Sequence, residues 1–303
     1  MYNIELGKSG LSVPTVAVGC MRISGMSEIQ ASAFVDTCLE NGANFFDHAD
    51  IYGAGESEVV FGKAISGMRE KVIIQTKCGI VPGKMFDFSY EHIIDSVDGS
   101  LKRLGTEYID VLLLHRPDAL MEPEEVARAF GKLKASGKVR NFGVSNQNPY
   151  QMQLLNQYLD MPICANQLQF SIMHAPMIQS GINVNMYNDS AVNRDGGVLD
   201  YCRLNNITIQ PWSPMQYGFF EGCFVDNDKF PQLNKVLENL AEKYSVSKIT
   251  IAIAWILRHP AKMMPITGTT NLSRLCDSFK ATEIKLTREE WYDIYKAAGN
   301  VLP

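Results

Sequence analysis

Residues 71–115, KVIIQTKCGIVPGKMFDFSYEHIIDSVDGSLKRLGTEYIDVLLLH, hold two short apolar runs separated by a helical pattern. The runs are KVIIQTK at 71–77 and YIDVLLLH at 108–115. Between them, Ser89 is a candidate N-cap and Gly105 a candidate C-cap of a helix with apolar residues on one face. A buried strand, a helix and a second buried strand are typical of a parallel crossover. The stretch therefore predicts one unit of a parallel α/β fold.

The same alternation runs along the chain. Helical patterns lie between the apolar runs, as at 27–42 and at 123–137, where Pro123 opens the helix and Gly137 ends it. Eight such units predict an α/β fold of the closed (β/α)8 TIM-barrel type, as a single domain over 1–303. An open doubly wound sheet is the alternative. The eight runs are residues 16–19, 43–47, 71–77, 108–115, 139–145, 163–167, 207–212 and 263–268.

Three segments fall outside this repeat. Residues 4–14 alternate apolar and polar positions around a glycine turn and predict an N-terminal β-hairpin. The long segments 170–197 and 214–230 follow the sixth and seventh runs, so we expect them at the C-terminal face of the barrel. Helices are expected at the end of the chain, over residues 231–244, 248–258 and 287–297.

The composition is that of an ordinary globular protein. With a net charge of −5 and 20% charged residues, no clustered positive surface for nucleic acid is expected. The seven cysteines form no C-x-x-C pair, which favours reduced thiols in the cytoplasm. The N-terminus has no signal-peptide pattern, and the longest apolar run, at 249–257, is too short to cross a bilayer. We therefore expect a cytoplasmic protein without nucleic-acid or membrane partners.

Four titratable residues follow hydrophobic runs at what would be one rim of the barrel: Asp47, Tyr52, Lys77 and His115. Since charged residues are rarely buried unless paired, we expect them to converge in one pocket. There Lys77 would lower the pKa of the Tyr52 phenol, and Asp47 would keep Lys77 charged. His115 could hydrogen-bond a substrate carbonyl. Such a set protonates an oxygen, and the group that attacks carbon should come from a cofactor.

Each of these residues also has a purely structural explanation. Asp47 and Lys77 could pair only to close the rim, His115 could be a satisfied core residue, and Tyr52 could serve packing alone. The order in which all four reach one rim is hard to explain by packing, and this favours the catalytic interpretation.

The sequence contains no motif for nucleotide binding at a glycine-rich loop, for metal binding or for a hydrolase. The segment GAGESE at 53–58 carries Glu58 at the third fingerprint position and follows the second run, so it fails as a dinucleotide-binding loop and predicts only a turn into the next helix. No phosphate-binding P-loop, zinc-protease motif, compact His/Cys cluster for a metal or G-x-S-x-G elbow is present. We therefore predict no metal.

At these residues the chain resembles the aldo-keto reductases, NAD(P)H-dependent carbonyl reductases built on a (β/α)8 barrel. FDHADIYG at 46–53 is similar to the family's D-x-A-x-x-Y-G signature, and IIQTKCG at 73–79 and DVLLLHRPD at 110–118 are similar to its lysine and histidine segments. The resemblance covers nearly the whole chain. NQLQFSIMH at 166–174 and ITIQPWSP at 207–214 resemble a bacterial branch of poorly characterised cytosolic reductases.

The resemblance implies reduction of aldehydes or ketones to alcohols, with hydride from the nicotinamide C4 and a proton from Tyr52. It makes Lys77 and Asp47 the groups that tune the pKa of Tyr52, and His115 the group that orients the carbonyl. It assigns Ser145 and its neighbours to the nicotinamide carboxamide and an aromatic residue, here a tryptophan in place of the commoner tyrosine, to the nicotinamide ring. These residues are Ser145, Asn146, Gln167 and Trp212.

A phosphate site is predicted at TGTTNLSRL, residues 267–275. Two threonine hydroxyls, Gly268 and Arg274 lie near the start of a helix that Asn271 would cap, which suits the 2′-phosphate of NADPH rather than NADH. Many members of the family carry a lysine where Gly268 stands. An ordinary helix cap with a surface arginine is the alternative. The predicted cofactor residues are Met21, Arg22, Ser145, Asn146, Gln167, Trp212, Ser213, Pro214, Gly268, Thr269, Thr270 and Arg274.

Apolar side chains near the rim favour an aromatic or aliphatic carbonyl substrate. They could also simply cover the barrel mouth. We expect a small-molecule carbonyl as the substrate and a monomer or weak homo-oligomer as the assembly. A rival function is an NADPH-binding regulatory module, similar to the ion-channel auxiliary subunits among the relatives of this barrel, with little turnover; the intact set of four residues and the short N-terminus favour an enzyme. A hydrolase or lyase would need a metal or nucleophile, and none is visible. The predicted substrate residues are Met21, Tyr217, Phe219 and Phe220.

Overall fold

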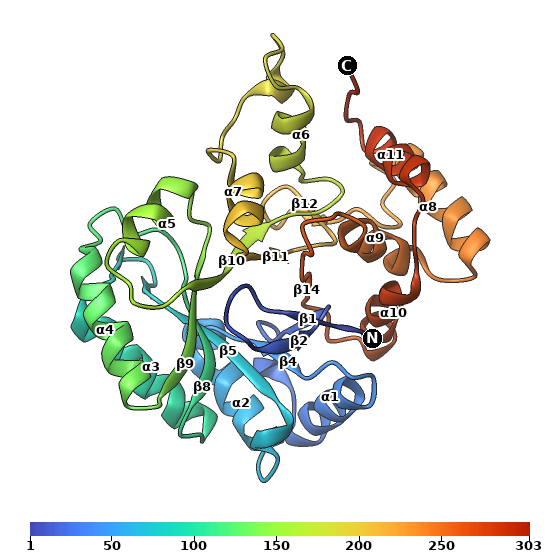
Figure 1. The fold of residues 1–303 in the computed structure, drawn as a ribbon. Coiled ribbons are helices and arrows are strands. Elements are labelled where there is room, and N and C mark those ends of the chain that lie inside the picture. Colours follow the sequence, from blue (N-terminus) through green and yellow to red (C-terminus); the bar gives the residue numbers. More distant parts are fainter.

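The computed structural model describes all residues from Met1 to Pro303, and its centre is a parallel sheet of eight strands (Figure 1). The strand order is β11-β10-β9-β8-β5-β4-β3-β14, and the Met264 N–H donates to the Ile209 carbonyl at 2.9 Å where the two ends of this order meet. The predicted (β/α)8 barrel is therefore confirmed. The strands are β3 (Ala17–Gly19), β4 (Phe45–Asp47), β5 (Ile73–Cys78), β8 (Ile109–Leu114), β9 (Val139–Ser145), β10 (Ile163–Gln169), β11 (Thr208–Trp212) and β14 (Ile266–Thr267).

Helices form a ring around this sheet (Figure 1). They begin at the predicted caps: the Ser89 hydroxyl accepts from the His92 N–H at the start of α3, and Gly105 ends α3 with a φ of 62°. The helices are α1 (Glu28–Glu40), α2 (Glu56–Ala64), α3 (Tyr90–Leu104), α4 (Pro123–Ala135), α5 (Pro149–Asn156), α6 (Pro176–Ile182), α7 (Val198–Asn205), α8 (Pro231–Tyr244), α9 (Lys248–Leu257), α10 (Leu272–Lys280) and α11 (Arg288–Ala297).

The predicted N-terminal hairpin, β1 (Asn3–Glu5) with β2 (Ser12–Pro14), closes one end of the barrel. Leu6 is fully buried in a small apolar cluster with side chains from the barrel strands. Gly7 lies so close to β10 that an added Cβ would stand 2.2 Å from the Cys164 carbonyl oxygen. These contacts are at the N-terminal ends of the strands, so the opposite end carries the opening.

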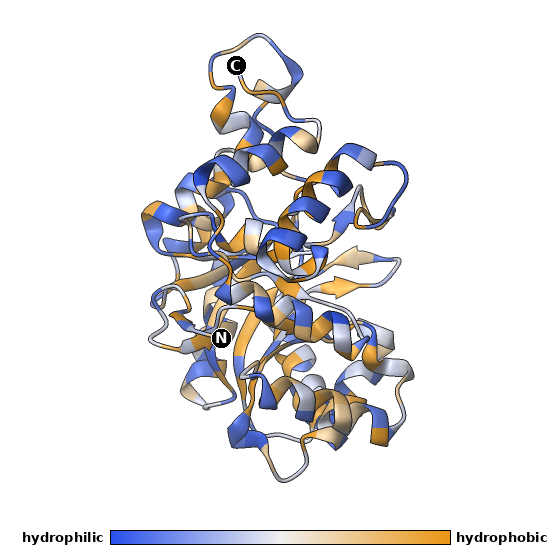
Figure 2. Ribbon diagram, turned by 90° about the vertical axis from the view of Figure 1, so that its right-hand side faces the viewer, coloured by the Kyte–Doolittle hydropathy of each residue, from blue (hydrophilic) through white to orange (hydrophobic).

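The main core lies between the sheet and the helices and contains 64 buried residues. Figure 2 shows hydrophilic colour along the outer faces of the helices and hydrophobic colour on the strands. At the C-terminal end of the chain, Trp255 of α9 stacks on Trp291 of α11 with ring centroids 4.8 Å apart. Each indole N–H donates to the other residue's carbonyl at 3.0 Å, which fixes α11 to the barrel.

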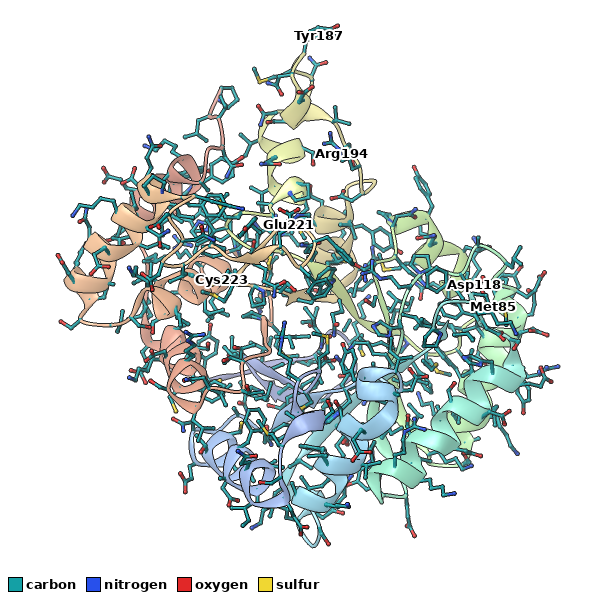
Figure 3. The ribbon with its side chains drawn as sticks, turned by 180° about the vertical axis from the view of Figure 1, so that it is seen from behind. Met85, Asp118, Tyr187, Arg194, Glu221 and Cys223 are labelled. Atoms are coloured by element: carbon teal, nitrogen blue, oxygen red, sulfur yellow. The ribbon has the colours of Figure 1, made fainter.

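The two long segments are more ordered than the sequence indicated. Residues 170–197 contain α6 and a short 3-10 turn, and they project away from the barrel with Tyr187 at the tip (Figures 1 and 3). Residues 214–230 contain a small hairpin of β12 (Gln216–Tyr217) and β13 (Gly222–Cys223). A second unpredicted hairpin, of β6 (Ile80–Val81) and β7 (Met85–Phe86), follows β5. None of the helices has the length and apolar character that a membrane span requires.

Candidate active site

A cavity of about 810 Å³ lies at the C-terminal ends of the strands, a size that suits a small-molecule ligand. Its wall comes from the ends of the barrel strands and from segment 214–230, whereas no residue of 170–197 contributes to it. Most residues singled out in the sequence line this one cavity. They are Met21, Arg22, Asp47, Tyr52, His115, Ser145, Asn146, Gln167, Trp212, Ser213, Pro214, Phe219, Phe220, Gly268, Thr269, Thr270 and Arg274.

Two predicted residues lie outside the lining. Lys77 is fully buried behind it, in contact with Asp47 and Tyr52. The Tyr217 ring instead packs edge-on against Phe230 at 4.9 Å, and its hydroxyl accepts from Lys229 Nζ at 3.2 Å. The structure therefore does not bring Tyr217 together with the other predicted substrate residues.

Lys77 connects the residues at the base of the cavity. Its Nζ donates to Asp47 Oδ2 at 2.8 Å, to the His48 carbonyl at 2.7 Å and to the Tyr52 hydroxyl at 3.2 Å. The Tyr52 and His115 rings lie edge to face, with centroids 6.0 Å apart. The parallel register pairs Asp47 with Gln75, two residues before Lys77, and pairs Lys77 with Leu113, two residues before His115. Because side chains two residues apart point to the same face of a sheet, Asp47, Lys77 and His115 share one face. An ammonium, a phenol and an imidazole thus meet at one point.

The electrostatics differ from the sequence prediction for the tyrosine. Burial raises the pKa of Tyr52 above its ordinary value, while the charge on Lys77 lowers it by less. Lys77 thus acts on this pKa in the predicted direction, but desolvation in so enclosed a position outweighs it and makes the net shift upward. For Lys77, burial disfavours the charge, but Asp47 and Tyr52 outweigh it and raise the pKa above its ordinary value. Lys77 therefore stays protonated.

His115 is neutral at physiological pH. Burial, together with the charges of Lys77 and Arg116, holds the pKa of the His115 imidazole well below its ordinary value. Its Nδ1 is buried without a hydrogen-bond partner, whereas the ring lines the cavity. A neutral imidazole can donate one N–H to an oxygen in the cavity without giving up a proton.

Three glutamines inside the barrel form a hydrogen-bonded group with Asp47, and two of them, Gln75 and Gln210, are not among the residues predicted from the sequence. Gln75 Nε2 donates to Asp47 Oδ1 at 2.6 Å, and Gln167 Nε2 donates to the same oxygen at 3.0 Å. Gln75 and Gln210 exchange hydrogen bonds of 2.9 and 3.0 Å. A glutamine within an apolar strand, as in IIQTK and ITIQPW, was the available signal, since a buried amide needs partners.

The ends of β9, β10 and β11 form a second polar group. Ser145 Oγ donates to the Gln167 carbonyl at 3.1 Å, and Asn146 Nδ2 donates to Ser145 Oγ at 2.7 Å. The Trp212 indole donates to Asn146 Oδ1 at 3.2 Å. Asn146 and Ser213 have left-handed φ values of 57° and 52°. Non-glycine residues in this region are uncommon, and both of these line the cavity.

The third group lies at the start of α10. Asn271 caps this helix as predicted, with its side chain accepting from the Arg274 N–H at 3.0 Å. Arg22 reaches across from the end of β3 and donates to the Gly268 carbonyl at 3.1 Å. Arg22 and Arg274 line the cavity, and neither forms an ion pair with a carboxylate. The geometry leaves two guanidinium groups available to an anion.

The glycine pair after Tyr52 is a turn. Gly53, Ala54 and Gly55 have φ values of 58°, 55° and 94°, and α2 begins directly after them. A Cβ on Gly53 would meet the Ser24 side chain at 2.6 Å, which explains the residue type. The turn sets the position of the Tyr52 hydroxyl and contributes no glycine to a nucleotide loop.

A barrel whose open end holds a buried Asp–Lys–Tyr–His set defines a class of enzyme, and the whole chain agrees with it. The chain belongs to the aldo/keto reductase family, whose model matches residues 15–298. It is an NAD(P)H-dependent oxidoreductase, as the family and its oxidoreductase relatives indicate. The family supports reduction of carbonyl groups as its reaction.

Several known proteins resemble this chain over nearly their full length. "Uncharacterized oxidoreductase YcsN" of Bacillus subtilis and "Oxidoreductase YdhF" of Escherichia coli are each 34% identical, with 98% of both chains covered. A "6-dehydroglucose reductase" of Agrobacterium fabrum is 33% identical, again over 98% of both chains. Among solved structures, the thermostable aldo-keto reductase Tm1743, in complex with the inhibitor epalrestat, has a TM-score of 0.79 at 26% identity and covers 98% of this chain and 100% of its own.

Proposed function

We propose that the protein reduces aldehydes or ketones to alcohols with NADPH, and that Tyr52 gives the proton to the carbonyl oxygen. The observation that carries the proposal is the contact of 3.2 Å between Lys77 Nζ and the Tyr52 hydroxyl at the base of the cavity. The neutral His115 lines the cavity beside them. One oxygen atom of a ligand could receive hydrogen bonds from both Tyr52 and His115.

The residues that line the cavity suit the chemical groups of NADPH. Ser145, Asn146 and Gln167 offer amide and hydroxyl groups that suit a carboxamide, and Trp212 beside them offers a flat ring. At the other end, the unpaired guanidinium groups and the hydroxyls at the start of α10 suit phosphate. When bound, NADPH supplies the hydride at C4 of its nicotinamide. The residues for phosphate are Arg22, Thr269, Thr270 and Arg274.

The protein's own groups perform the proton transfer. The raised pKa of Tyr52 keeps the phenol protonated, so it is ready to donate. His115 donates an N–H to the carbonyl oxygen and holds it toward the phenol, which stabilises charge that develops there. As the proton leaves, the Lys77 ammonium stabilises the phenolate, and Asp47 keeps that ammonium in place at 2.8 Å. A positioned proton donor of this kind contributes about 10²–10⁴-fold to the rate.

Apolar side chains enclose the space beside these groups. The cavity wall here suits the hydrocarbon part of an aromatic or aliphatic carbonyl compound. Its apolar residues are Met21, Ile51, Ile80, Phe219 and Phe220. The cytoplasmic location stays a prediction from the sequence. A monomeric or weakly oligomeric state likewise stays a prediction from the sequence.

The test has two stages. NADPH and NADH are first titrated against the protein by fluorescence, and the tighter cofactor is then oxidised in the presence of a carbonyl panel that includes 6-dehydroglucose, because one relative is named for that substrate. Turnover with tighter binding of NADPH supports the proposal. Tight binding of NADPH with no turnover on any carbonyl would favour the regulatory alternative.

A further inference from the structure

We propose that Arg116 is a specificity residue that selects carbonyl substrates carrying an oxyanion, such as a carboxylate or phosphate, near the reacting carbonyl. The inference rests on the proposed reductase function and names the class of substrate. Arg116 follows His115 at the end of β8 and lines the cavity. Arg116 is not among the residues predicted from the sequence, although its position directly after a strand-end histidine was a usable signal.

The charge on Arg116 has no partner in the protein. It forms no ion pair and no side-chain hydrogen bond, and its guanidinium carbon lies 5.5 Å from the centroid of the Trp212 ring. The two carboxylates of the cavity wall are engaged elsewhere, because Asp47 pairs with Lys77 and Asp226 pairs with Lys248. A half-buried arginine without a carboxylate partner is free to bind an oxyanion of a ligand.

The proposed cofactor does not account for this charge. The cations assigned to its phosphates are Arg22, which bonds to Gly268, and Arg274 of α10. Arg116 instead lies with Trp212, at the end of the cavity that holds the proton donor. The cavity therefore has two cationic zones, one formed by Arg22 and Arg274 and one by Arg116. The phosphates of the proposed cofactor would pair with the first zone, and no anion has yet been assigned to the second.

The location of Arg116 also limits where the anion can be on the substrate. Arg116 directly follows His115 in the chain, and its guanidinium carbon lies over the Trp212 ring. An oxyanion bound by Arg116 therefore lies on the side of the cavity where His115 would hold the carbonyl. A guanidinium presents its donors in a planar fork that matches carboxylate and phosphate oxygens, whereas the apolar wall formed by Phe219 and Phe220 suits the rest of the substrate.

The experiment compares substrates that differ only in charge. Wild-type protein, Arg116→Gln and Arg116→Lys are assayed with 3- and 4-carboxybenzaldehyde and with the methyl ester of each. We expect the wild type to prefer at least one acid over its ester in kcat/KM, and Arg116→Gln to reduce that preference about 10- to 100-fold. Arg116→Lys keeps the positive charge but loses the planar pair of N–H donors, so it should retain more of the preference for the acid than Arg116→Gln does. NADPH affinity, from the fluorescence titration, should stay the same in both variants.

The control is Arg194→Gln, which removes the same charge from the projecting segment, outside the cavity lining (Figure 3). It should leave the ratio of acid to ester unchanged. Reduction of the esters without any preference for an acid, an unchanged preference in Arg116→Gln, or a loss of NADPH affinity as large as the loss in kcat/KM would each overturn the inference and leave the reductase function standing. Failure to reduce any carbonyl would overturn the proposed function itself.

Discussion

The Lys77 ammonium lies 3.2 Å from the Tyr52 hydroxyl and 2.8 Å from a carboxylate oxygen of Asp47. This fully buried cation therefore touches the phenol on one side and its counter-charge on the other. Because burial raises the pKa of Tyr52, the lysine does not make the phenol a strong acid in the resting site. It limits the cost of forming the phenolate, which matters only while the proton is leaving.

Replacing Tyr52 with phenylalanine removes the proposed proton donor and keeps the ring. We expect kcat/KM for carbonyl reduction to fall about 10²–10⁴-fold. NADPH affinity should stay nearly the same, because the residues proposed to bind NADPH lie elsewhere in the cavity. Steady-state assays and fluorescence titration measure the two quantities. A variant with full turnover would contradict the role assigned to Tyr52.

His115→Phe removes the imidazole donor and should lower kcat/KM about 10²–10³-fold. Because the pKa of His115 is held well below its ordinary value, the imidazole stays neutral over the pH range in which an ordinary histidine titrates, about 6 to 8. The ratio of wild-type to variant rates should therefore be constant over that range. If a charged imidazolium were the donor, the ratio would decline with rising pH, and the neutral-imidazole assignment would be wrong.

Lys77→Met leaves the Asp47 carboxylate buried without its counter-charge, with only the two glutamine amides to solvate it. Breaking a buried pair in this way should lower the free energy of unfolding by about 3–5 kcal/mol. Since the Lys77 pKa is raised, the pair's contribution is complete below the ordinary lysine pKa and is lost only as the pH rises through the folded-state value.

Urea unfolding near neutral pH measures this loss. The matched control is Lys138→Met, which removes an ion pair with Asp98 whose side chains are 39% and 48% exposed. Exposed pairs contribute about 0–1 kcal/mol, so the control should unfold almost as the wild type does. Equal losses in both variants would show that Lys77 has no special structural role.

Arg274→Gln tests the preference for NADPH. The Kd for NADPH should rise about 10- to 100-fold, since a hydrogen-bonded charge pair with phosphate is removed. The Kd for NADH, which has no 2′-phosphate, should change little. Arg288→Gln is the control, because Arg288 likewise lies in the first turn of a helix but does not line the cavity. If the affinities for both cofactors fall equally, Arg274 does not bind the 2′-phosphate.

Gly7→Ala tests how the hairpin seals the barrel. Gly7 and Gly10 have φ values of 54° and 73°, so alanine is strained at both. Only at Gly7 would the new methyl group meet backbone, 2.2 Å from the Cys164 oxygen. We expect Gly10→Ala to cost about 1–2 kcal/mol and Gly7→Ala about 1–3 kcal/mol more, measured by urea unfolding. Similar losses at both positions would mean that the hairpin can shift without cost.

The fold was predictable because it depends on a pattern that repeats. Each strand is a short apolar run, and caps such as Ser89 and Gly105 mark the ends of a helix with local chemistry that the sequence displays directly. The hairpins of β6 with β7 and of β12 with β13 were not predicted, since strands of two residues are too short to carry a periodic signal.

The sequence by itself determined the barrel, the family and the four residues at its rim, because parallel strands must bring their C-terminal ends to one face. Only the tertiary structure decided what surrounds them. It set the raised pKa of Tyr52, placed Tyr217 against Phe230 and left Arg116 without a counter-charge. Burial and pairing arise from contacts between distant segments, and a single chain position does not reveal how much water or charge its neighbours will leave around it.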